Sequence, residues 1–380
     1  MDYAASTPVD KAVIKAMAPY FDLTFGNPHA LHFFGQKASS AVFQSRRSFA
    51  DSIGADYREI LFTGSATEAN NLAIRGIVRN YLRSGGKNPR VIVSVIEHES
   101  ILETSRDLEK DGVEIVYLPV SSEGLVDLDR LARAINSRTV LVSVMHANNE
   151  VGVVQPIKRI SEIVKAARGS GSYPVFHTDA AQSLQYLDCS PKNIGADLIT
   201  FSAHKIYGPK GIGALYVGRN IQNLIQPVIT GSGQEGGLRS GTDNVPYIVG
   251  FAKALELANK MKNNETLRIA GLRDYFWAEM SRKNPGLRIN GSVAHRLPNN
   301  LNIYFPGKKA HDLQIALDLS GVAVSTGAAC SVRVAESSHV LEAMGFDRKR
   351  SSGSLRLSLG RSTTKKDLQY VINVMSGLLQ

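Results

Sequence analysis

The chain has 380 residues, of which 43% are hydrophobic and 21% charged, and its formal net charge is +10. This is the composition of an ordinary soluble protein, and the length favours two or three domains. No apolar run reaches the roughly 18 residues of a membrane span. The first ten residues lack the basic and apolar regions of a secretory signal. We therefore expect a cytoplasmic protein with no membrane partner.

The two cysteines, Cys189 and Cys330, exclude a four-cysteine zinc site, and the missing signal argues against a structural disulfide. We expect no bound metal. The densest basic segment, residues 348–366, contains no aromatic residues, and the chain carries no nucleic-acid motif. We therefore expect no nucleic-acid partner. The positive charge indicates a solvated surface, or attraction to anionic ligands or acidic partners.

Short apolar runs alternate with amphipathic stretches between residues 58 and 217. Several runs lack polar alternation, which is typical of strands covered on both faces. This alternation predicts an α/β domain with a mostly parallel, seven-stranded sheet sandwiched by helices. The expected strands are 59–63, 90–96, 113–120, 139–147, 173–180, 197–203 and 213–218, and the helices between them include 67–83, 99–111, 127–136 and 157–170.

The pattern changes after about residue 250, where a long helix (246–263) leads into a less regular unit. We interpret this unit as a smaller α+β domain. The chain opens almost directly into the motif DYAAST with no room for a leading strand, which suggests that the sequence starts late. The expected strands of the small domain are 297–305, 321–327 and 354–360. We assign residues 7–252 to the large domain, and residues 1–6 and 253–380 to the small one.

Polar side chains follow four of the expected strands. In an open parallel sheet, ligands bind beyond the carboxyl ends of the strands. Each residue alone has a structural explanation as a turn or a helix cap. Their arrival at one edge instead predicts a binding site. The residues are His98, Asn149, Asp179, Gln182, Ser202, His204 and Lys205.

A possible anion site follows the first expected strand, where a turn of small residues (64–67) precedes a helix. The first amides of a helix lack internal partners and favour phosphate. No Gly-Lys-Ser/Thr sequence follows, so this is not a nucleotide P-loop. The alternative is an ordinary helix cap by Ser65 or Thr67.

A second glycine-rich stretch, residues 231–236, matches the pattern G-x-G-x-x-G. A dinucleotide fingerprint must open a helix, whereas GLRSGTDNVP follows here. We therefore expect no dinucleotide. A loop carrying Arg239, Ser240 and Thr242 is more typical of a lid or an intersubunit contact.

A phosphate site, a lysine, a carboxylate and a stacking candidate (His98) at one edge favour pyridoxal phosphate. This cofactor needs a lysine for its Schiff base and a carboxylate that keeps its pyridine nitrogen protonated. Lys205 and Asp179 meet these needs. The 64–67 turn, with Ser202 and His204, would bind the phosphate.

Motifs along nearly the whole chain resemble those of one family, the cysteine desulfurases. They are DYAASTPVD, FGNPHALH, TGSATEANNLAI, EHES, HANNEVGVVQP, HTDAAQS, FSAHKIYGPKGIGALYV, GGLRSGTDNVP, STGAAC and SLRLSLGRSTT. This family belongs to the class V group of aminotransferases within pyridoxal-phosphate fold type I. The lysine segment and SLRLSLGR are the most specific matches.

The resemblance implies a role for each matching residue around the cofactor. Lys205 would form the Schiff base and move the substrate Cα proton. Asp179 would pair with the pyridine nitrogen, Gln182 would bind the ring hydroxyl, and His98 would stack on the ring and shuttle protons. Asn149 would line the cofactor and the substrate. The residues implied to hold the phosphate are Ala66, Thr67, Ser202 and His204, helped by Thr242 from the other subunit of a homodimer.

The resemblance also implies the reaction. Arg356 would bind the carboxylate of L-cysteine, assisted by Asn27 and Asn149. Cys330, in a stretch of small residues, would attack the substrate sulfur, release L-alanine and keep the sulfur as a persulfide for an acceptor protein. Cys189 lies outside every matched motif, and we expect it to be a small buried residue.

The cysteine stretch lacks the proline and acidic flank of many family members. The chain also ends without the longer tail that some use for an iron–sulfur scaffold. The acceptor therefore stays open between iron–sulfur assembly, tRNA thiolation and cofactor synthesis. The alternatives are a selenocysteine lyase, an aminotransferase, or a non-catalytic binding protein on the same scaffold.

Overall fold

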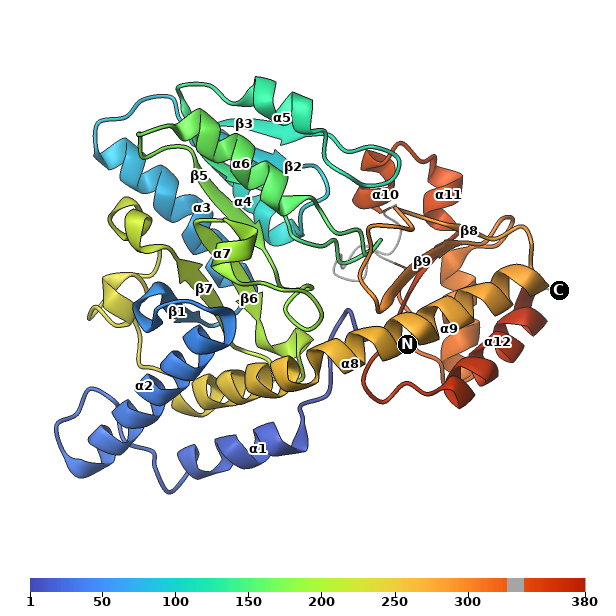
Figure 1. Ribbon diagram of the computed structural model, residues 1–380, viewed down its shortest axis with the longest axis horizontal. Coiled ribbons are helices and arrows are strands. Elements are labelled where there is room, and N and C mark those ends of the chain that lie inside the picture. Colours follow the sequence, from blue (N-terminus) through green and yellow to red (C-terminus); the bar gives the residue numbers. More distant parts are fainter. Residues whose placement is uncertain (327–337, 380) are drawn as a thin grey trace.

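The computed structural model describes residues 1–326 and 338–379, which form a seven-stranded sheet and a separate three-stranded sheet (Figure 1). All seven strands expected in the first part of the chain are present, each slightly shorter than its apolar run. They are β1 (Ile60–Thr63), β2 (Arg90–Ser94), β3 (Glu114–Leu118), β4 (Thr139–Ser143), β5 (Val175–Asp179), β6 (Leu198–Ser202) and β7 (Gly213–Val217).

The order in the large sheet is β1-β7-β6-β5-β4-β2-β3. The strands from β3 to β6 pair in parallel, while β7 runs antiparallel between β1 and β6. The expectation of a mostly parallel sheet is therefore confirmed. Because β2, β4, β5 and β6 share one direction, the loops that follow them meet at the same edge.

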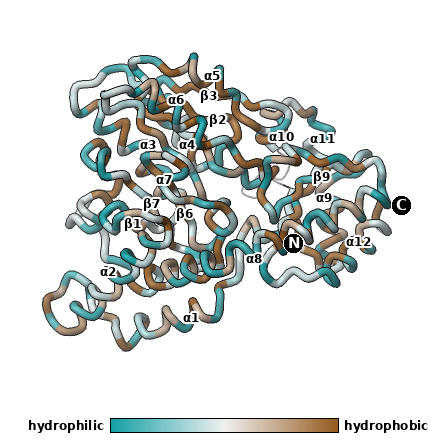
Figure 2. Tube along the Cα trace, viewed as in Figure 1, coloured by the Kyte–Doolittle hydropathy of each residue, from teal (hydrophilic) through white to brown (hydrophobic). Residues whose placement is uncertain are grey.

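Helices cover both faces of the large sheet. Adjacent strand residues point to opposite faces, so Ile60 and Phe62 join one core cluster and Leu61 joins the other. Figure 2 shows hydrophobic stretches along the central strands. The helices of this part are α1 (Lys11–Met17), α2 (Phe33–Ile53), α3 (Ala66–Arg83), α4 (Glu99–Lys110), α5 (Leu128–Ala134), α6 (Ile157–Arg168) and α7 (Pro191–Ile194).

A long helix, α8 (Val245–Lys283), runs from one sheet to the other along the lower side of Figure 1. Its first half buries Phe251 in the core of the large sheet, and its second half buries Phe276 in the core of the small one. The helix is therefore much longer than the expected 246–263. The proposed boundary after residue 252 lies within it, and that division of domains stays a prediction.

The small sheet is antiparallel, in the order β10-β9-β8. The expected strand at 321–327 does not form over its described residues, where only Ser325 bridges to Arg356. The N-terminus lies beside this sheet, because Ser358 N donates to Met1 O at 2.8 Å. The elements are β8 (Arg288–Ile289), β9 (Asn300–Tyr304), β10 (Ser354–Ser358), α9 (Ala310–Leu319), α10 (His339–Ala343), α11 (Arg348–Ser352) and α12 (Lys365–Leu379). Over residues 1–326 and 338–379, no helix has the length and apolarity to cross a membrane.

Candidate active site

A cavity of about 450 Å³ lies at the edge where the parallel strands end, and Arg356 reaches it from the small sheet. Most of the residues predicted from sequence line this one cavity, although they come from distant parts of the chain. They are Ala66, Thr67, His98, Asn149, Asp179, Gln182, Ser202, His204, Lys205 and Arg356.

Three predicted residues are not placed in the cavity. Asn27 and Thr242 are exposed and do not line it. Their segments meet each other elsewhere on the surface, where His29 Nε2 lies 3.2 Å from Asp243 Oδ2. Cys330 lies outside the described residues. The roles of these three residues stay predictions.

Lys205 ends a short 3-10 helix (Ala203–Lys205) that directly follows β6. Its Nζ donates to the carbonyl oxygens of Ala4 at 2.6 Å and Ala5 at 2.8 Å. Gln182 Nε2 also donates to Ala4 O, at 3.0 Å. The N-terminal segment therefore forms a wall of the cavity and holds the lysine amine at a defined point. Ala4 and Ala5 could not be recognised individually as site residues from their side chains, because they act through backbone carbonyls.

Asp179, the last residue of β5, is held by two donors. Its Oδ1 accepts from Ala181 N at 2.8 Å, and its Oδ2 accepts from Asn70 Nδ2 at 2.8 Å. The same Asn70 nitrogen donates to Ser100 Oγ at 2.9 Å, and Ser100 N donates to His98 Nδ1 at 3.1 Å. Asn70, fully buried on α3, thus links the carboxylate to the histidine. Sequence reasoning missed it.

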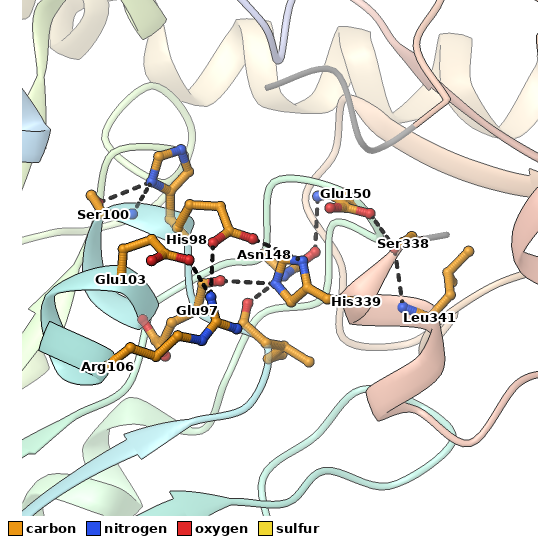
Figure 3. Close-up of polar contacts among 12 residues, drawn as sticks. Glu97, His98, Ser100, Glu103, Arg106, Asn148, Glu150, Ser338, His339 and Leu341 are labelled. Carbon is orange, nitrogen blue, oxygen red and sulfur yellow. Dashed lines mark hydrogen bonds and ion pairs between the residues drawn. The ribbon is translucent and has the colours of Figure 1, made fainter. Parts of the chain in front are cut away.

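His98 is also the N-cap of α4, which fixes its ring (Figure 3). Because Nδ1 accepts the backbone N–H of Ser100, the neutral ring carries its proton on Nε2. An aromatic ring in a fixed orientation at the cavity wall is suited to stacking on a planar ligand.

Two buried titratable groups beneath the cavity are neutral. Burial raises the pKa of Glu97 to about 8, although its Oε1 accepts from Ser94 Oγ at 2.5 Å and from Met145 N at 2.8 Å. Burial lowers the pKa of His177 to about 4. Neither group therefore carries a charge at neutral pH that would compete with Asp179.

His204 is neutral as well, because burial and then the nearby cations Lys205 and Lys210 lower its pKa to about 4. Its carbonyl accepts from Thr7 N at 3.0 Å, and its Nδ1 lies 3.4 Å from Ser6 Oγ. His204 thus braces the turn and also faces the cavity. Lys210 is exposed and also lines the cavity.

The predicted phosphate turn opens α3 at the cavity. Ser65 caps the helix by accepting from Glu68 N at 3.1 Å, so Ala66 and Thr67 supply the first helical amides. The cap and the anion site are thus compatible. A Cβ at Gly213 would lie 2.5 Å from Ser65 C and 2.7 Å from Ala66 N. The turn can therefore rest against β7 only because that residue is glycine.

Arg356 is nearly fully buried in the middle of β10. Its Nη2 donates to Asp2 Oδ1 at 2.8 Å, and its Nη1 donates to Asn149 O at 3.0 Å. Within the described residues its Nε has no hydrogen-bond partner. The guanidinium is therefore oriented in advance by the N-terminus and by the loop after β4. Asp2 was not predicted as a site residue.

The loop with the G-x-G-x-x-G pattern does not open an α-helix, since only a 3-10 turn (Glu235–Gly237) forms there and α8 begins at Val245. It is held against α2, because Arg46 binds both carboxylate oxygens of Glu235 at 2.6 and 2.7 Å. Arg239 Nε also donates to Glu68 Oε1, at 2.8 Å. The expectation that this loop is no dinucleotide fingerprint agrees with this geometry.

Cys189 is buried, and burial raises the pKa of its thiol to about 12. The neighbouring His146, whose Nδ1 is 3.9 Å from Sγ, has its own pKa lowered by burial to about 4. The two residues are therefore neutral and do not form a thiolate–imidazolium pair. Among the described residues, no group of three or more His, Cys, Asp and Glu is arranged to hold a metal ion.

Comparison with known proteins decides the family. The aminotransferase class-V family model matches residues 1–371. The cysteine desulfurase IscS of Dictyoglomus turgidum is 42% identical over 100% of this chain and 94% of its own length. The chain belongs to the cysteine desulfurase family. It is thus a pyridoxal-phosphate-dependent enzyme, which confirms the cofactor and the enzyme class implied by the motifs.

Solved structures of this family share the fold. A NifS-like protein superimposes with a TM-score of 0.92 at 34% identity, covering 100% of this chain and 98% of its own. The structure described as SspA in complex with cysteine gives a TM-score of 0.83 at 35% identity, over 94% and 97% of the two chains. The expected fold type is therefore confirmed.

The residues of the cavity fit pyridoxal phosphate. The cavity contains the restrained amine of Lys205, the carboxylate of Asp179 and the amino-terminal end of a helix. Gly213 leaves the room that the turn at this helix end requires. The amine can bind the aldehyde of the cofactor, the carboxylate can bind its pyridine nitrogen, and the helix end can bind its phosphate.

Proposed function

We propose that the chain converts L-cysteine to L-alanine and keeps the released sulfur as a persulfide on Cys330. The observation that carries this proposal is the convergence of Lys205, Asp179 and Arg356 on one cavity. An amine, a carboxylate and an oriented guanidinium in one cavity suit an amino acid held on pyridoxal phosphate. The SspA structure, with cysteine bound, supports the choice of substrate.

Bound pyridoxal phosphate supplies an electron sink next to the Cα of the amino acid. Lys205 Nζ would hold the aldehyde end, Asp179 the pyridine nitrogen and Gln182 the ring hydroxyl, while His98 would stack on the ring. The residues proposed for the phosphate are Ala66, Thr67, Ser202 and His204, with Thr242 of the partner subunit.

The substrate is held from the small sheet. Arg356 would bind its carboxylate, a task suited to the planar fork of a guanidinium. Asn149 lies beside it, and Asn27 is proposed to assist. Lys205 Nζ, restrained by the carbonyls of Ala4 and Ala5, would move a proton at the substrate Cα. His98 Nε2, at the wall of the same cavity, would carry a proton.

The electrons of the sulfur transfer balance, so the reaction needs no added oxidant. The Cys330 thiolate attacks the substrate sulfur, so an S–S bond forms and the Cβ–Sγ bond of cysteine breaks. The electron pair of the broken bond remains on Cβ, which takes a proton and becomes the methyl group of alanine. The two sulfur atoms are oxidised and Cβ is reduced by the same two electrons.

We propose further that the chain acts as a cytoplasmic homodimer. The segment between α1 and α2, together with the first two residues of α2, exposes several large apolar side chains, a pattern typical of an interaction surface. The exposed Thr242 and Asn27 lie near this segment through the contact of His29 with Asp243. The exposed residues are Phe21, Leu23, Phe25, Leu31, Phe33 and Phe34.

The sulfur would pass to an acceptor protein, with an iron–sulfur scaffold as first candidate and tRNA or cofactor thiolation as alternatives. Alanine release from L-cysteine by the holoenzyme tests the reaction. We expect turnover without any 2-oxo acid and none by Lys205→Ala. Dependence on a 2-oxo acid would indicate an aminotransferase. Turnover of L-selenocysteine alone would indicate a selenocysteine lyase.

A further inference from the structure

Ser338, the first described residue after Cys330, makes a buried bond to the loop that follows β4. Its Oγ donates to Glu150 Oε2 at 2.5 Å, and both residues are almost fully buried. The same Oγ caps α10 by accepting from Leu341 N at 3.2 Å, as Figure 3 shows. Its backbone N donates to Ser351 Oγ at 2.9 Å. A buried carboxylate needs such donors, so this contact fixes Ser338 firmly.

The Glu150 loop is itself fixed to the loop after β2. Asn148 Oδ1 accepts from the backbone N of Glu150 at 2.8 Å and of Val151 at 2.9 Å. Asn148 Nδ2 donates to Ile96 O at 3.0 Å. Ser338 is therefore connected, through two buried polar side chains, to the loop that carries His98.

His339 makes a second connection to that loop. It contacts the residues directly before and directly after His98 in the chain, Glu97 and Glu99. Its Nε2 lies 3.1 Å from Glu97 O, an atom that can only accept, so this nitrogen carries a proton. Its Nδ1 lies 3.5 Å from Glu99 Oε1, an ion pair when the ring is protonated. Figure 3 shows His339 facing the Glu97–His98 turn from α10.

The other flank of the cysteine-bearing segment is also held at the site. Ser325 pairs with Arg356 in an antiparallel bridge, with N–O distances of 3.2 and 2.7 Å. Cys330 stands five positions after Ser325 and eight before Ser338. Before Cys330 in the chain, Ser325 is thus bound to Arg356, the residue proposed to bind the carboxylate. After Cys330, Ser338 and His339 are bound to the loops that carry His98 and Asn149.

We propose that Ser338 and His339 are positioning residues for the sulfur transfer, because they tie the chain after Cys330 to the loops that carry His98 and Asn149. This inference rests on the proposed function, in which Cys330 is the nucleophile. Holding a nucleophile near its target removes part of the entropic cost of the encounter. The two residues would therefore affect the attack on sulfur and leave cofactor and substrate binding unchanged.

The variants His339→Phe and Ser338→Ala test this role, with His311→Phe on the exposed surface of α9 as the matched control. Two quantities are measured in the holoenzyme: the change in cofactor absorbance on binding L-cysteine, and the rate of alanine formation in the first turnover. We expect unchanged binding in all variants and a roughly tenfold slower first turnover in the two test variants. Ser338→Thr, which keeps the hydroxyl, should restore the rate.

Alkylation of Cys330 by iodoacetamide in enzyme stripped of cofactor gives a readout independent of catalysis. A positioning role predicts that the test variants alkylate at least as fast as the wild type, since the thiol itself is unchanged. The proposal is overturned if their first turnover matches the control, or if it falls only in proportion to lost cofactor or substrate binding. If the wild type forms no alanine, the proposed function itself has failed.

Discussion

Asn70 Nδ2 donates to Asp179 Oδ2 at 2.8 Å and to Ser100 Oγ at 2.9 Å, so one buried amide holds two walls of the cavity. Ser100 in turn donates to the ring of His98. The carboxylate proposed for the pyridine nitrogen and the histidine proposed to stack are therefore oriented by a residue that does not itself line the cavity.

Replacing Asn70 with Leu should weaken cofactor binding by about 10- to 150-fold, because a hydrogen bond to a charged group contributes roughly 1.5–3 kcal/mol. Titration of cofactor-free enzyme with pyridoxal phosphate measures this. Asn80→Leu is the control, since Asn80 lies on the same helix but bonds to Tyr173, away from the cavity. Equal losses in both variants would show that only the helix had been destabilised.

The raised pKa of Glu97 predicts that the free energy of unfolding declines at alkaline pH. Its pKa is raised from 4.5 to about 8 in the folded protein, so the folded state binds the proton more tightly than the unfolded state. The contribution of Glu97 to the free energy of unfolding is fully present below pH 4.5 and is lost as the pH rises through 8. Between pH 7 and 9 the loss should be about 1.4 kcal/mol.

Denaturant unfolding of Glu97→Gln at pH 7 and pH 9 measures this contribution. Glutamine can accept the same bonds from Ser94 and Met145 without titrating, so the variant should show a smaller decline than the wild type. His146 and His177 do not contribute to a change in stability between pH 7 and 9. Their pKa values are lowered to about 4, so they affect stability only at acidic pH. Identical declines in both proteins would contradict a neutral Glu97.

Arg356→Lys should raise KM for L-cysteine about tenfold or more and change kcat less, because an ammonium cannot reproduce bidentate binding. Steady-state kinetics of alanine formation separate the two constants. The substitution also removes contacts to Asp2 and Asn149, so the unfolding midpoint should be compared with that of Arg348→Lys on the surface. A fall in kcat with unchanged KM would argue against a role in binding the carboxylate.

Cys189 should be chemically inert in the folded protein, because burial raises the pKa of its thiol to about 12 and almost none is thiolate at pH 8. Limited alkylation followed by peptide mapping should label Cys330 first. Cys189→Ala should keep its activity and lose about 1 kcal/mol of stability for the small cavity left behind. Rapid labelling of Cys189 in native protein would contradict this.

Most of the seven strands could be predicted because they are buried on both faces and therefore form apolar runs in the sequence. The edge strand β3 is mostly half-buried, but its residues Ile115, Val116 and Leu118 still form an apolar run. Helix α2 could not, since residues such as Gly35, Ala38 and Ser45 form much of its buried face and make only a weak apolar periodicity. The short strand β8 has two residues and no pattern of its own. The full length of α8 was missed because its two halves are buried in different cores.

The site residues on strand ends could be predicted because a parallel sheet brings its carboxyl ends together. Asn70 could not, since it resembles any polar residue within a helix. Asp2 and Ala4 reach the site only because the N-terminus folds back beside β10, an arrangement encoded in long-range packing. The contacts of Ser338 and His339 likewise join residues that are 188 and 242 positions apart in the chain.

The most direct test of the proposed mechanism follows the sulfur atom. Holoenzyme is mixed with L-cysteine, alanine is measured, and the peptides are mapped by mass spectrometry. We predict one extra sulfur atom on the peptide that contains Cys330. Alanine should form in Cys189→Ala but not in Cys330→Ala, which should keep the absorbance of bound cofactor. Alanine formation at the wild-type rate in Cys330→Ala, or extra sulfur on Cys189, would contradict the mechanism.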